Sequence, residues 1–248
     1  MEKQSTIKKD LGINLKNIIL SSRQLCDIEL ILNEAFKPIN SFLNKSDYES
    51  VLDNMRLHDG AVWPIPINLD LSKEQVSAIK DKEKIALRDQ EGFLIAILTI
   101  QDIWKPDKEK EAIKVYGTKN KEHPGVTTLF NTNEYYIAGE LKKINIPTHH
   151  DFIELRHTPE QVKENIKKLK NNSTIAFQTR NPIHRAHQEL ITRSMEELNA
   201  NILIHPVVGM TKSGDVNHFT RVNCYKKILN YLPKESTLLS LIPLAMRM

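Results

Sequence analysis

The chain has 248 residues, of which 40% are hydrophobic and 27% are charged, and its formal net charge is +4. This composition is typical of a folded protein and excludes a disordered tail, and no stretch is apolar for long enough to span a bilayer. The N-terminus lacks the basic-then-apolar pattern of a signal peptide, so we expect a cytoplasmic protein. The two cysteines, Cys26 and Cys224, lie too far apart in sequence to indicate a metal-binding cluster.

Two segments near the N-terminus have the spacing of amphipathic helices. The first covers residues 21–32 and begins beside serines that can cap it. The second covers residues 47–55, and the side chains expected on its inward face are Tyr48, Val51, Leu52 and Met55.

Strand patterns follow these helices. Apolar residues alternate over 65–71, and two further apolar runs, 85–87 and 93–100, flank the turn sequence at 89–92. Apolar runs on either side of such a turn predict a hairpin. We therefore expect a small barrel or mixed sheet decorated by helices, forming a first domain over residues 1–148.

The rest of the chain alternates between helix and strand patterns. In chain order we expect a helix at 159–169, a strand within 174–178, a helix at 182–198, an apolar run at 202–208, a helix at 222–231 and a run at 237–242. This alternation predicts an α/β domain with a parallel sheet over residues 149–248. Ligands of such sheets bind at the carboxyl ends of the strands.

The segment 176–187 joins an apolar strand to a helix through a polar turn. Pro182 suits the first position of that helix, because its missing N–H group would be unpaired there. Free N–H groups and the helix dipole make such a position favourable for an anion. His184 and His187 would share one helix face, and the planar guanidinium of Arg180 matches a tetrahedral oxyanion.

Each of these features has an ordinary explanation when it is taken alone. A single arginine on a turn is usually solvated, and two histidines three residues apart often form a surface pair or half of a zinc site. No third zinc ligand is evident in the sequence, so we predict no protein-bound metal. Together, at one junction of strand and helix, these residues favour phosphate or sulfate chemistry.

The segment 178–187 resembles the Q-T-R-N-P-x-H-x-x-H signature of the ATP sulfurylase family. The segments that also resemble family sequence are 23–29, 55–57, 63–66, 86–89, 122–126, 205–215 and 244–248. The resemblance implies a PUA-like N-terminal domain followed by a Rossmann-like nucleotidyltransferase domain that is incomplete at its C-terminus.

The resemblance also implies a reaction and roles for individual residues. A sulfate oxygen attacks the α-phosphorus of ATP in line, which gives adenosine 5'-phosphosulfate and releases pyrophosphate, and Mg²⁺ is expected on the ATP. The implied catalytic residues are Thr179, Arg180 and Asn181. Sulfate binding is implied for Gln178 and Arg180. The residues implied in ATP binding are Gln178, Thr179, Arg180, Asn181, His184 and His187.

Alternatives remain open at this point. Family members continue beyond the position of Met248, so we expect a fragment, half of a split protein or a degenerate copy, and a non-catalytic partner subunit is the alternative function. An RNA-binding module would need a basic groove with exposed aromatic residues. A related nucleotidyltransferase with an organic acceptor would be favoured by a neutral residue in place of Arg180. The partners expected are ATP and sulfate, with another copy of the chain or a complementing C-terminal segment, and neither nucleic acid nor membrane.

Overall fold

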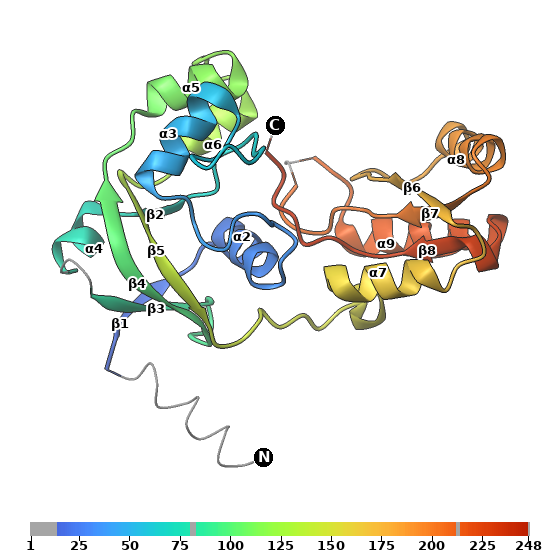
Figure 1. Ribbon diagram of the computed structural model, residues 1–248, viewed down its shortest axis with the longest axis horizontal. Coiled ribbons are helices and arrows are strands. Elements are labelled where there is room, and N and C mark those ends of the chain that lie inside the picture. The colour runs from blue at the N-terminus through green and yellow to red at the C-terminus, as the bar shows by residue number, and fades with distance from the viewer. Residues whose placement is uncertain (1–13, 80–82, 212–213, 248) are drawn as a thin grey trace, which may run out of the picture. The chain divides into compact units, whose positions relative to one another are not determined.

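The computed structural model describes residues 14–79, 83–211 and 214–247 (Figure 1). The chain divides into two compact units, the first made of residues 1–147 with 247–248 and the second of residues 148–246. Each unit has its own sheet and its own hydrophobic core. No helix in the described ranges is both long enough and apolar enough to cross a bilayer.

The first unit is built on a five-stranded sheet with the order β1-β3-β4-β5-β2. Its strands are β1 (Lys16–Ile19), β2 (Leu69–Leu71), β3 (Lys84–Arg88), β4 (Leu94–Trp104) and β5 (Tyr135–Lys143). β1 pairs with β3 in parallel, whereas the other neighbours are antiparallel. The mixed sheet predicted for this half of the chain is confirmed, and β3 and β4 form the predicted hairpin.

The helices of the first unit are α2 (Ser22–Leu32), α3 (Lys45–Asn54), α4 (Lys73–Ser77), α5 (Lys108–Tyr116) and α6 (Pro124–Phe130). α2 begins where the sequence predicts because Ser21 and Gln24 form a capping box, in which each backbone N–H donates to the other's side chain. The inward position predicted for Met55 is wrong. Met55 follows the last residue of α3 in the left-handed conformation, with φ of 52°, and is 63% exposed.

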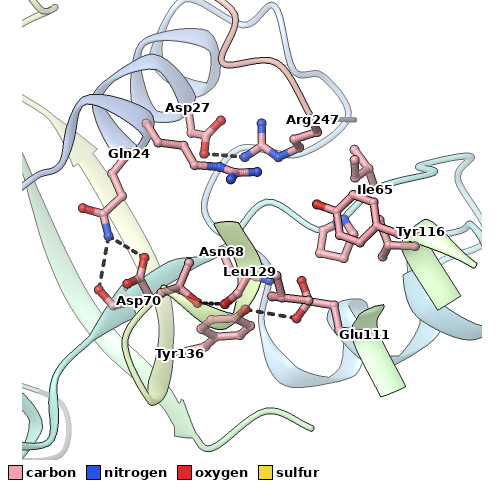
Figure 2. Close-up of a pocket in the computed structure, with 14 residues that line it drawn as sticks. Gln24, Asp27, Ile65, Asn68, Asp70, Glu111, Tyr116, Leu129, Tyr136 and Arg247 are labelled. Atoms are coloured by element: carbon pink, nitrogen blue, oxygen red, sulfur yellow. Dashed lines mark hydrogen bonds and ion pairs between the residues drawn. The ribbon is translucent and has the colours of Figure 1, made fainter. Parts of the chain in front are cut away.

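A carboxyl group lies inside the first unit. Glu111 of α5 is 7% exposed, and its Oε2 accepts hydrogen bonds from the hydroxyl groups of Tyr48, at 2.9 Å, and Tyr136, at 3.0 Å. Glu111 lines a cavity of about 40 Å³ together with Gln24, whose amide donates to Asp70 Oδ1 (Figure 2). Burial raises the pKa of Glu111 and so favours its protonated form.

The second unit contains a three-stranded sheet with the order β6-β7-β8, in which both pairings are parallel. Its strands are β6 (Ser173–Phe177), β7 (Ala200–Ile204) and β8 (Thr237–Leu239), and its helices are α7 (Pro159–Lys167), α8 (Arg185–Glu197) and α9 (His218–Ile228). Short 3-10 helices cover η1 (Ile153–Leu155), η2 (Leu229–Tyr231) and η3 (Lys234–Ser236). Ile191 of α8 and Val222 of α9 join Ile204 in the core beside the sheet. The predicted α/β fold with a parallel sheet is confirmed.

Two helices begin three or more residues away from their predicted starts. α8 begins at Arg185 rather than at Pro182, because His184 has the extended backbone of an N-cap residue, with φ of −107° and ψ of 176°. Pro182 therefore belongs to the turn before the helix. α9 begins at His218, where Asn217 caps it through a hydrogen bond from the N–H of Phe219, and not at residue 222.

Candidate active site

The parallel strands of the second unit end on one edge of the sheet, and the loops that follow them continue to pair there. The N–H of Val207 donates to the carbonyl oxygen of Thr179 over 2.9 Å, and the N–H of Val208 donates to that of Ile242 over the same distance. The loops after β6, β7 and β8 therefore form one surface. This is the carboxyl edge, where parallel α/β sheets bind their ligands.

The turn after β6 is closed by Thr179. This residue is 8% exposed, and its hydroxyl oxygen lies 3.0 Å from the N–H of Asn181 and 3.1 Å from the carbonyl oxygen of Asn181. The neighbouring side chains of Gln178 and Asn181 are exposed at the edge. The hydroxyl of Thr179 thus shapes the turn, while Gln178 and Asn181 face solvent, where a ligand can reach them.

Arg180 extends from this turn toward two other segments of the unit. Its Nε lies 3.6 Å from Oδ2 of Asp215, and its Nη1 lies 3.7 Å from the sulfur of Met246. The Arg180 side chain is 20% exposed, whereas that of Asp215 is only 7% exposed. A partly buried arginine held beside a carboxylate has a defined orientation, which suits recognition of an oxyanion.

The two histidines of the motif lie together at the start of α8. The rings of His184 and His187 are stacked with their centroids 3.8 Å apart, and His187 also packs against Phe177, at 5.5 Å. His184 is the N-cap residue, but its side chain makes no capping hydrogen bond. The first N–H groups of α8 therefore have no side-chain cap from His184, and such groups favour an anion.

The predicted site lacks two residues that the structure brings to the turn. Arg221 of α9 donates from Nη1 to the carbonyl oxygens of Arg180, at 3.0 Å, and Val207, at 2.7 Å. The hydroxyl of Tyr225 donates to the carbonyl oxygen of Asn181 over 2.8 Å. Burial raises the pKa of this hydroxyl, although the charge of Arg221 opposes the shift. The sequence signal for this pair is their spacing of four residues on one helix face.

His205 follows β7 directly at the carboxyl edge of the sheet. Burial lowers the pKa of its imidazole, and electrostatic repulsion between this ring and the His157 ring lowers it further. Burial also lowers the pKa of His157. Both rings therefore favour the neutral form.

Sequence models of two protein families match the chain. One is described as a PUA-like domain and matches residues 1–146, and the other is described as ATP-sulfurylase and matches residues 153–248. A sulfate adenylyltransferase of Schizosaccharomyces pombe is 48% identical over 238 residues, which are 95% of this chain and 49% of that relative. The chain belongs to the ATP-sulfurylase family.

A second curated relative and a solved structure are also similar to the chain. A sulfate adenylyltransferase of Saccharomyces cerevisiae is 49% identical over 230 residues, which are 92% of this chain and 45% of the relative. A solved structure described as a hexameric APS kinase from Thiobacillus denitrificans is similar with a TM-score of 0.79 and 30% identity, covering 98% of this chain and 44% of that one. This ATP-sulfurylase family chain thus spans about half the length of the curated relatives that it matches. The family match confirms the predicted resemblance, and the roles of the individual site residues stay predictions.

Proposed function

We propose that the second unit binds ATP and sulfate at the turn after β6 and serves in sulfate adenylyl transfer, which gives adenosine 5'-phosphosulfate and pyrophosphate. The observation that carries this proposal is the position of Arg180. It lies at the carboxyl edge of a parallel sheet, beside Asp215 and next to the start of α8. Membership in the ATP-sulfurylase family supports the same reaction.

The proposed reaction needs placement and charge stabilisation rather than a covalent intermediate. Arg180 reduces the repulsion between sulfate and the α-phosphate by donating parallel hydrogen bonds to oxyanions. Gln178 and Asn181 donate from their exposed amides, to sulfate and to phosphate oxygens respectively. His184 and His187 hold the β- and γ-phosphates near the N-terminus of α8, where the helix dipole stabilises the departing pyrophosphate.

In this proposal Thr179 acts mainly by holding the turn. Its hydroxyl is within hydrogen-bonding distance of both the N–H and the carbonyl oxygen of Asn181. The hydroxyl thereby holds the two peptide groups on either side of the Asn181 side chain. This is a different role from the direct contact with phosphate that the family resemblance implies.

Magnesium enters the proposal as part of the substrate. In the described part of the chain, no group of three or more His, Cys, Asp and Glu side chains is arranged to hold a metal ion. Mg²⁺ is instead expected on the phosphate oxygens of ATP, since it prefers oxygen ligands and retains several water molecules.

Calorimetric titration tests this proposal. We expect the chain to bind ATP with magnesium, and to bind sulfate, at a site that the Arg180→Lys variant weakens about tenfold or more, because lysine keeps the charge but loses the planar pair of donors. Arg193→Lys is the matched control, since Arg193 is an exposed residue of α8 that pairs with Glu189. If Arg180→Lys and Arg193→Lys bind ATP and sulfate with equal affinities, Arg180 does not belong to the site.

A further inference from the structure

The charge of Arg221 is buried and bound to main-chain groups. Arg221 is 1% exposed, and its guanidinium donates to three carbonyl oxygens, those of Arg180 and Val207 from Nη1 and that of Val216 from Nε. Burying a guanidinium is costly unless such bonds offset the loss of water. Any movement of these three carbonyl groups away from Arg221 would therefore be opposed.

Tyr225 extends this contact to the next peptide group. It lies one helical turn after Arg221, is fully buried, and donates from its hydroxyl to the carbonyl oxygen of Asn181. Arg221 and Tyr225 therefore hold two consecutive carbonyl groups, those of Arg180 and Asn181. These are the residues whose side chains we propose to contact the substrates.

Thr179 adds further contacts to the main chain of this turn. Thr179 bonds locally to Asn181, and the carbonyl of Thr179 accepts from Val207. A hydrogen bond to each carbonyl restricts the rotation of its peptide plane, and that rotation changes the direction of the adjoining side chains. Preorganised side chains bind a transition state better, because their ordering is already complete before the substrate arrives.

We propose that Arg221 and Tyr225 of α9 are positioning residues, which act through the carbonyl groups of Arg180 and Asn181 and set the direction of those side chains. This inference rests on the proposed function for the identity of the ligands. The hold on the turn by α9 itself can be measured without any ligand.

Hydrogen–deuterium exchange of the unliganded chain tests the hold on the turn. Tyr225→Phe removes only the hydroxyl group, so the core packing is retained. We expect the N–H groups of Asn181 and Val207, which bond to Thr179, to exchange about tenfold faster in this variant. The N–H of Ser240, which donates to Ile204 at the neighbouring strand, should exchange at its original rate.

Two further variants complete this experiment. Tyr231→Phe is the matched control, because Tyr231 lies just beyond α9 and is 70% exposed, and it should change none of these rates. Arg221→Lys keeps a positive charge but cannot reach all three carbonyl groups, so it should loosen the turn more than Tyr225→Phe does. If Arg221→Lys does not fold, Tyr225→Phe alone decides. Unchanged exchange at Asn181 and Val207 in a folded Tyr225→Phe variant would overturn the proposal.

Ligand binding separates this inference from the proposed function. We expect Tyr225→Phe to weaken ATP binding about fivefold to tenfold while its thermal unfolding midpoint stays within a few degrees of the original. Faster exchange with unchanged affinity would make α9 a support of the fold only and would also overturn the proposal. If the parent chain binds neither ATP nor sulfate, the proposed function is wrong. Faster exchange in the Tyr225→Phe variant would in that case still support the restraint of the turn by α9.

Discussion

The carboxylate of Asp215 lies 3.6 Å from Nε of Arg180, and both side chains are largely shielded from solvent. A carboxylate beside an arginine that we propose to bind an anion has two opposing effects on the affinity for that anion. The carboxylate orients the guanidinium, but it also repels an approaching anion. The separation exceeds a hydrogen-bond length, so the effect is one of orientation by charge rather than of a strong bond.

We expect orientation to outweigh repulsion, so that Asp215→Asn lowers the affinity for sulfate about tenfold, a loss of about 1.4 kcal/mol. Calorimetric titration with sulfate measures the change. Glu189→Gln, which removes an exposed carboxylate from α8, should leave the affinity unaltered. Tighter sulfate binding by Asp215→Asn would show that repulsion dominates.

The stacked pair of His184 and His187 should affect the two substrates differently. Replacing either with glutamine removes the imidazole that we assign to the terminal phosphates of ATP, so ATP affinity should fall about tenfold while sulfate affinity stays constant. Because the rings touch each other, the double variant should lose less than the sum of the two single losses. An equal loss of both affinities would point to damage at the start of α8 instead.

Gly209 allows two loops of the edge to approach each other. A Cβ atom at this position would lie 2.3 Å from the carbonyl oxygen of Leu244, closer than any real contact. Gly209→Ala should therefore destabilise the second unit by about 1–3 kcal/mol, measured by urea unfolding, and should weaken ATP binding. Gly60→Ala, where a Cβ atom would meet open space, is strained only by its φ of +90° and should leave ATP binding unchanged. Unaltered stability of Gly209→Ala would mean that the loops separate easily.

Glu111 gives the first unit a pH dependence of defined sign. Since burial raises its pKa above the ordinary 4.5, the folded state is favoured below that pH and loses stability as the pH rises toward the raised value. Glu111→Gln lacks this ionisation, so its free energy of unfolding should improve relative to the parent as the pH rises from below 4.5 to neutral. The exposed Glu49 of α3 supplies the control, because Glu49→Gln should not alter the slope. A difference that shrinks with pH would contradict the assignment.

Local patterns were sufficient to predict many elements of this fold. The capping box of Ser21 and Gln24 marks the start of α2, and the turn at 89–92 marks the β3–β4 hairpin, because each signal lies within a few neighbouring residues. The motif at 178–187 similarly placed the candidate site after a strand and before a helix. These features depend on short-range physics that a sequence displays directly.

Long-range contacts explain what the sequence could not show. Pro182 is well suited to begin a helix, yet the turn continues to His184 because Thr179 and Tyr225 both bond to Asn181. Arg221 carries a charge and is nevertheless buried, because carbonyl groups from separate loops accept its hydrogen bonds. No periodicity in a sequence encodes partners of this kind.

Pyrophosphate release from ATP and magnesium by the purified chain, measured with and without sulfate, is the sharpest test of the proposed reaction. We predict release that depends on sulfate and that falls about a hundredfold or more in Arg180→Ala, because the variant removes a principal donor to the reacting oxyanions. Three results would contradict the proposed reaction. They are pyrophosphate release that does not depend on sulfate, equal release by Arg180→Ala, and no release from a folded chain that binds ATP.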